Sequence, residues 1–189
     1  MKKLVLIIAL AVTPIITFGQ GLFDKYEDLD DVTSVVVNSK MFSMISQIEI
    51  NTDDADAQAF VDMVKSLKSL KVLTTGDAGV SANMKSDVNK YLSSSQLEEL
   101  MRIKDGDQTV KFYVKEGKDE NHVKELLMFV TGLKEITKDQ DITINGHKRE
   151  IETVILSLTG DIDLRQVSKL TSQMDVPGGK HLKKAEKKN

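Results

Sequence analysis

Residues 97–115 read LEELMRIKDGDQTVKFYVK, two strand-like runs that flank the turn Asp105-Gly106-Asp107. The glycine in the middle of this turn tolerates the positive φ that a tight hairpin needs. In the second run Val110, Phe112 and Val114 alternate with polar side chains, which is the period of a strand with one face in a core. The stretch therefore predicts a β-hairpin, and with it a sheet that contains antiparallel neighbours.

More strands and helices are predicted on both sides of this hairpin. Runs of β-branched or apolar residues predict strands over 32–38, 72–75, 123–130 and 151–158. Within the third run, residues 125–129 fit a buried helical turn equally well. Apolar residues three and four apart predict helices over 40–48, 52–70, 80–91 and 163–174. The polar stretch 132–150 contains Asn145-Gly146, which predicts a further hairpin turn. This order predicts an α+β fold in a single domain, a mostly antiparallel β-sheet with helices packed on one face.

The first nineteen residues have the three-part layout of a secretory signal peptide. Met1-Lys2-Lys3 is a positive start, Leu4–Phe18 is almost wholly apolar, and Thr17 and Gly19 are small residues ahead of a cut at Gln20. A membrane anchor is the alternative, but a fifteen-residue helix covers only about 22 Å of a hydrocarbon core roughly 30 Å thick. We expect cleavage and export to the periplasm, the outer membrane or the exterior, with no transmembrane segment left afterwards.

Composition limits the rest of the chain. Its 189 residues contain no cysteine, which excludes disulfides, Cys-ligated metals, cysteine nucleophiles and a lipoprotein anchor at the cut. We expect residues 20–176 to form the domain and residues 177–189 to form a disordered basic tail. The body between leader and tail is acidic, which argues against a nucleic-acid groove.

Asp161 and Asp163 are the candidate catalytic residues. They lie two positions apart, after a predicted strand and before a predicted helix. Two such carboxylates can hold a metal or share a proton. A carboxylate- or metal-dependent hydrolase would use them together with Asp105 or Asp107.

A structural role accounts for the same segment. Gly160 allows the chain to turn, and Asp163 can cap the helix that follows it, with Gln166 completing a capping box. The sequence favours the cap over the catalytic pair.

Other acidic residues and the histidines are weaker candidates for a metal site. Calcium could bind either of two carboxylate clusters, Asp28, Asp30 and Asp31 or Asp53, Asp54 and Asp56. Neither has the spacing of an EF-hand, and carboxylates like those of the second cluster are also typical of a helix N-terminus. The three histidines, His122, His147 and His181, have no partner at metal-ligand spacing. We expect no metal and no cofactor.

The eight methionines are common enough to suggest a binding groove, because methionine adapts to varied partners. However, Met41, Met44, Met63 and Met84 all fall on the apolar faces of predicted helices. We therefore expect them to lie mostly in the core.

Several segments together resemble one protein family. They include Phe23-Asp24-Lys25-Tyr26, Leu100-Met101-Arg102-Ile103-Lys104-Asp105-Gly106 and Ser157-Leu158-Thr159-Gly160-Asp161-Ile162-Asp163-Leu164. In these the chain resembles the Bacteroidota envelope proteins grouped as domain of unknown function 4252. The resemblance implies an exported Gram-negative protein and no assigned activity. Many relatives carry a cysteine at the cut that this chain lacks, and residues 131–150 look longer than the usual hairpin.

Together these features predict a non-enzymatic binding or interaction module of the cell envelope, for which an envelope protein could be the partner, and they leave the oligomeric state open. The hydrolase at Asp161 and Asp163 is the second hypothesis, and stabilisation by calcium at Asp28–Asp31 is the third. The lysine tail could touch anionic lipid or only aid solubility.

Overall fold

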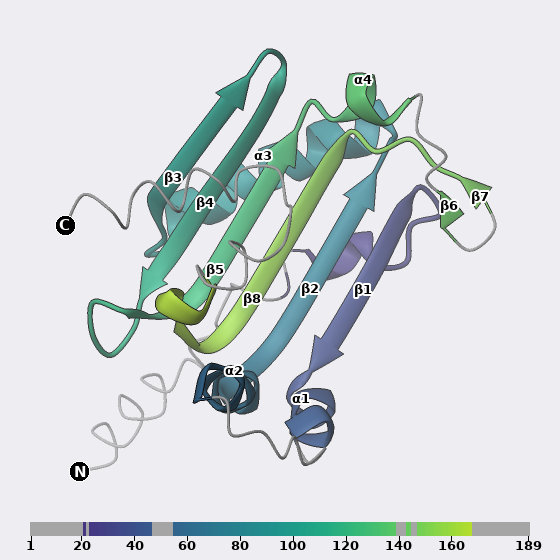
Figure 1. The fold of residues 1–189 in the computed structure, drawn as a ribbon. Helices are drawn as coiled ribbons and strands as arrows, with labels where there is room; N and C mark the ends of the chain where they lie inside the picture. The colour runs from purple at the N-terminus through teal and green to yellow at the C-terminus, as the bar shows by residue number, and fades with distance from the viewer. Residues whose placement is uncertain (1–20, 22, 47–54, 139–142, 145–146, 168–189) are drawn as a thin grey trace, which may run out of the picture.

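A six-stranded antiparallel sheet forms the centre of the protein (Figure 1). The computed structural model describes residues 21, 23–46, 55–138, 143–144 and 147–167. The strand order is β1-β2-β8-β5-β4-β3. Their bounds are β1 Val32–Asn38, β2 Leu67–Thr75, β3 Glu98–Asp105, β4 Gln108–Glu116, β5 His122–Thr131 and β8 Thr153–Asp163. The predicted α+β class and the hairpin across Asp105-Gly106-Asp107 are confirmed.

The helices lie behind the sheet and at both of its ends (Figure 1). The longest helix, α3, crosses behind the strands, whereas α1 and α2 lie at the lower end of the sheet in this view. The bounds are 3₁₀ helix Asp24–Tyr26, α1 Ser39–Ser46, α2 Ala55–Ser66, α3 Ala78–Ser94 and α4 Lys134–Thr137. A separate two-stranded sheet pairs β6 Thr143–Ile144 with β7 His147–Lys148 in antiparallel fashion, and Asn145-Gly146, where the sequence predicts a turn, lies outside the described residues.

The main core lies between α3 and the sheet. Ile155 of β8 is flanked by Leu73 of β2 and Phe129 of β5 in the strand register, and Ile155 and Leu73 are completely buried. Met84 and Val88 of α3 pack into the same cluster. Complete burial of such side chains contributes about 1.5–3 kcal/mol each, so this contact fixes α3 on the sheet. Asp77 caps the helix, because its side chain accepts a 2.7 Å hydrogen bond from the Val80 amide.

A smaller core fills the end of the sheet beside α1 and α2. It consists of the buried residues Phe42, Leu67, Val123, Leu126 and Ile162. These residues come from α1, β2, β5 and β8, so the cluster joins the first helices to strands that follow much later in the chain.

The second predicted helix is too long by four residues. The sequence predicts helix to Leu70, but α2 ends at Ser66, and Leu67–Leu70 belong to β2. The Ser66 hydroxyl contacts both the Met63 carbonyl and the Asp161 carbonyl, which marks the change from helix to strand. Hydrogen bonding of β2 to both β1 and β8 outweighs the helical spacing of Leu67 and Leu70.

Strand β8 is longer than its predicted range and includes the segment that the sequence predicts to be a turn. It runs to Asp163, with Gly160 at φ 146° inside the strand. A Cβ on Gly160 would lie 2.6 Å from the Ser66 carbonyl oxygen. Gly160 therefore allows β8 to pass close to the junction of α2 and β2, where the register between β2 and β8 shifts.

Replacing Gly160 by alanine is expected to lower the free energy of unfolding by at least about 2 kcal/mol, because it adds backbone strain and a backbone clash. The matched control is Gly106→Asn. Gly106 also has positive φ, 55°, but nothing lies within 4 Å of the position that a Cβ there would take, and asparagine tolerates this conformation. Urea denaturation of both variants checks the difference, and equal losses would contradict the assignment of a close approach to Gly160.

A carboxylate is buried beside the main core. The Tyr91 hydroxyl of α3 donates to the carboxylate of Glu125 in β5, with both oxygens at 2.8 Å. Burial raises the pKa of Glu125, and the Tyr91 hydrogen bond offsets part of that rise. Compared with a neutral carboxyl at the same place, the ionised carboxylate therefore lowers the free energy of unfolding at neutral pH.

Glu125→Gln should raise the free energy of unfolding at pH 7 by on the order of 1 kcal/mol, because the amide oxygen keeps the Tyr91 hydrogen bond without a buried charge. When the pKa of a carboxyl is raised in the folded state, the free energy of unfolding of the protein increases as the pH falls. The advantage of the variant should therefore shrink on acidification and vanish once the wild-type carboxyl is protonated in both states. Denaturation curves at neutral and acidic pH measure it, with the exposed Glu116→Gln as the control. A less stable variant at pH 7 would contradict this account.

Candidate functional site

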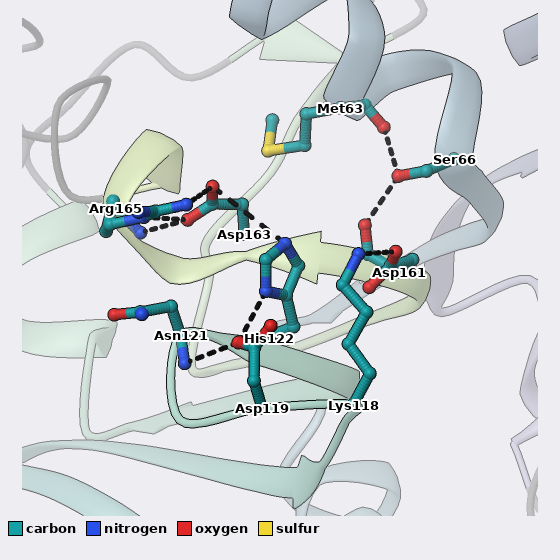
Figure 2. Close-up of polar contacts among 9 residues, drawn as sticks. All are labelled: Met63, Ser66, Lys118, Asp119, Asn121, His122, Asp161, Asp163 and Arg165. Carbon is teal, nitrogen blue, oxygen red and sulfur yellow. Dashed lines mark hydrogen bonds and ion pairs between the residues drawn. The ribbon is translucent and has the colours of Figure 1, made fainter.

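A polar cluster lies where the last residue of β8 faces the first residue of β5 (Figure 2). His122 of β5 is opposite Asp163 of β8 in the strand register. Its Nδ1 lies 2.6 Å from the Asp119 Oδ1, and its Nε2 lies 4.0 Å from the Asp163 Oδ2. One imidazole thus lies between two carboxylates, from a loop and from a strand end.

Asp163 is held chiefly by Arg165. The guanidinium donates two hydrogen bonds to its carboxylate, at 3.0 and 2.7 Å, and the Arg165 amide donates a third at 2.9 Å. These bonds lower the pKa of Asp163, so the carboxylate stays ionised. Helical backbone starts at Leu164, so Asp163 occupies the predicted capping position. The capping bond comes from Arg165, and the rest of the predicted helix, 168–174, lies outside the described residues.

Asp161 points to a different partner (Figure 2). Its carboxylate accepts a 2.6 Å hydrogen bond from the Lys118 ammonium, and both side chains are about half exposed. The sequence places Asp161 and Asp163 together as a pair, whereas in the structure each binds its own cation. The arrangement neutralises charge and caps a helix.

Asp105 and Asp107 lie at the other end of the sheet. They belong to the β3–β4 hairpin, where Thr109 of β4 pairs with Thr131 at the far end of β5 from His122. Ten residues of β5 therefore separate this turn from Asp163, a span of about 30 Å. The structure does not bring these four aspartates into one site.

The calcium-ligand candidates that the structure describes, Asp28, Asp30 and Asp31, form no grouped site either. No cluster of three or more His, Cys, Asp or Glu side chains that could hold a metal occurs within the described ranges, which include Asp28–Asp31. The backbone oxygens of Asp30 and Asp31 accept hydrogen bonds from Arg149 and Thr75, so this segment is tied to the fold. The side chains of Asp53, Asp54 and Asp56, as well as His147 and His181, lie outside what the structure describes.

A polar hollow of about 550 Å³ lies where α3 leads into β3, and no motif in the sequence indicates it. Its lining includes two lysines and two glutamates, Lys115, Lys124, Glu98 and Glu116. Beside them the Ser95 hydroxyl is buried with no hydrogen-bond partner among the described residues. The lining has no net formal charge and no strong preference for one ionic ligand.

Exposed apolar side chains are concentrated in β1, at the opposite edge of the sheet, and in the segments directly before and after it. Among the described residues, six of the eight exposed large apolar side chains fall within residues 29–45, namely Leu29, Val35, Val36, Met41, Met44 and Ile45. We call these six the β1 surface. The prediction that the four helix methionines lie in the core is half right: Met63 and Met84 are buried, but Met41 and Met44 are 49% and 57% exposed.

The two edge strands differ sharply in chemistry. β3 has the sequence EELMRIKD, with five charged residues and a register shift between Glu99 and Met101. β1 has the sequence VTSVVVN, with no charge and no proline, and it pairs with β2 over seven consecutive residues without a bulge. Charges and bulges prevent an edge from pairing with another chain, whereas a regular, uncharged edge favours such pairing. Both strands form borders of the sheet (Figure 1), and among the described residues β3 is the protected edge and β1 the open one.

No helix in the described part of the chain is long and apolar enough to cross a membrane.

The structure thus defines an α+β protein whose two sheet edges differ: the β3 edge is charged and bulged, and the β1 edge is uncharged and regular. The family described as Domain of unknown function (DUF4252) matches residues 26–170, and the chain belongs to this family. No curated protein and no solved structure matches the chain.

Asp163→Asn tests the structural role of the polar cluster. Asparagine keeps the cap but loses the ion pair, so the free energy of unfolding at pH 7 should fall by about 1 kcal/mol. Because the pKa of Asp163 is lowered in the folded state, this difference should disappear as the pH falls through that pKa. The half-exposed Asp161→Asn should change stability by no more than about 0.5 kcal/mol. Thermal or urea unfolding against pH measures both, and a larger loss for Asp161→Asn would contradict the assignment.

Proposed function

We propose that the protein is a non-enzymatic interaction module of the cell envelope that binds a protein partner by strand addition along β1. The observation that carries the proposal is that β1 is an uncharged, regular edge strand that occurs together with the exposed apolar side chains of the β1 surface. Strand addition supplies main-chain hydrogen bonds, and neighbouring apolar pockets or side chains supply specificity.

The exposed backbone edge is the first part of the argument. Within the part of the chain that the structure describes, β1 pairs with β2 alone, and in Figure 1 it forms the border of the sheet. Its outward amides and carbonyls are ready to pair with another strand. Val35 and Val36 point to opposite faces of the sheet and are each 50% exposed, so an added strand would cover apolar surface on both faces.

The helix that follows β1 is the second part. Phe42 is the buried residue among the described side chains of α1, whereas Met41, Met44 and Ile45 are exposed. These three side chains add exposed apolar area on the helix that directly follows β1 in the chain. Methionine side chains adapt to the shape of a partner.

The leader-like N-terminal sequence supports the envelope as the place of action. The basic start, apolar run and small residues of 1–19 have the pattern of a secretory leader. The polar cluster at Asp163 favours binding over catalysis, because Asp161 and Asp163 are each neutralised by a separate cation.

A photo-crosslinking amino acid tests the proposal in the cells that make the protein. At position 36 it should give a discrete protein adduct in the envelope fraction, because Val36 lies on the open edge. The matched control is position 100 on β3, where Leu100 is similarly exposed but the edge is charged and bulged. Adducts of equal yield from both positions, or none from position 36, would overturn the proposal.

A further inference from the structure

We infer that the strand added to β1 is β1 of a second copy of this chain, in an antiparallel pair related by a two-fold axis at Val35. This inference rests on the proposed function, since it names the partner at the same edge. The dimer would join two six-stranded sheets into one continuous sheet of twelve strands.

The sequence of β1 is compatible with pairing to itself. In the two-fold register Val35 faces Val35 of the other copy, Ser34 faces Val36, and Thr33 faces Val37. No charged residue occurs in the strand, so no like charges meet. β-Branched side chains opposite one another are also favourable neighbours on a pleated surface.

The residues beyond the two ends of β1 complement each other. Exposed Leu29 precedes the strand, and α1 with exposed Met41, Met44 and Ile45 follows it. An antiparallel pair brings the start of one β1 beside the end of the other, so Leu29 of each copy comes near the apolar side chains of the other copy's α1. The two-fold axis makes this contact twice, as in an isologous interface.

The charged residues beyond the two ends of β1 also complement each other. Asp30 and Asp31 lie immediately before β1, and Lys40 lies immediately after Asn38 and Ser39 at its other end. In the two-fold register the Lys40 end of one copy meets the acidic end of the other. Opposite charges would thus meet at both ends of the pair, which favours this register over a shifted one.

The dimer also removes the open edge. Both outer strands of the twelve-stranded sheet would be β3, the strand with five charged residues and a bulge. Self-association would therefore stop at two copies. An extended segment of an unrelated protein could pair with the backbone of β1. Only a second copy, however, automatically brings matching apolar and charged groups to both ends of the strand.

The first test is the mass of the chain lacking residues 1–19, by sedimentation or light scattering over about a hundredfold range of concentration, since a dimer dissociates on dilution. We expect a dimer. Val35→Lys should shift it to monomer, because the two lysines would face each other, and Val35→Glu should do the same. Mixing the two variants should restore the dimer, because unlike charges then face. The control Leu100→Lys should leave the dimer unchanged.

The second test uses the absence of native cysteine. Opposed residues in an antiparallel pair have Cα atoms about 4.5–5.5 Å apart, within the range of a disulfide. Under mild oxidation Val35→Cys should crosslink to itself. Thr33→Cys alone should not, but it should crosslink when mixed with Val37→Cys. This pattern is specific to the two-fold register.

The outcomes separate the inference from the proposed function. A monomer at every concentration, a dimer that Val35→Lys does not weaken, or failure of the lysine and glutamate variants to pair would overturn the inference. If position 36 still crosslinks to a different protein, strand addition at β1 stands with another partner. If position 36 also gives no adduct, both fail. Circular dichroism of each variant confirms that it is folded.

Discussion

The fold depends on the pairing of β8 with its two neighbours. β8 comes last in sequence among the described strands but lies near the middle of the sheet, between β2 and β5. On one side it joins β1 and β2, and on the other it joins the meander β5-β4-β3. It also supplies Ile155 to the main core and Ile162 to the smaller one. Without β8 these two parts of the sheet would share no hydrogen bonds.

Such a topology requires contacts between residues far apart in the chain. β2 and β8 are separated by more than seventy residues, so their pairing closes a long loop. Loop closure of this kind slows folding compared with local hairpins. Gly160 adds a constraint on sequence, because β8 passes the end of α2 where no side chain fits.

Local features of the fold could be predicted from the sequence. The hairpin at Gly106 and the helix with Met84 on its buried face follow from turn chemistry and periodicity, which act over a few residues. The capping role of Asp163 follows in the same way. The spacing of Leu67 and Leu70 predicts a helix wrongly, because a short apolar run fits both periods and pairing with distant strands decides between them.

Features that depend on position in the sheet could not be predicted. The runs of β1 and β3 both identify strands, but neither shows that its strand is an edge, and so the exposure of Val35 does not follow from them. Met41 and Met44 have the spacing of core residues, but α1 buries only Phe42 among its described side chains. Likewise the approach of His122 to Asp163 exists only through the β5–β8 register. The candidate site is thus a property of the assembled sheet.

The anchoring of the first described residues has a consequence for the order of events. Phe23 and Tyr26 are almost completely buried, and Lys71 of β2 forms ion pairs with Asp24 and Glu27. Under the proposed export, Phe23 follows the cut by only four residues. A protease needs an extended, accessible chain around the bond that it cleaves. Once Phe23 is buried, very few residues would separate it from that bond. Under this proposal the leader would be removed before Phe23 and Tyr26 become buried, so that cleavage would precede the last step of folding.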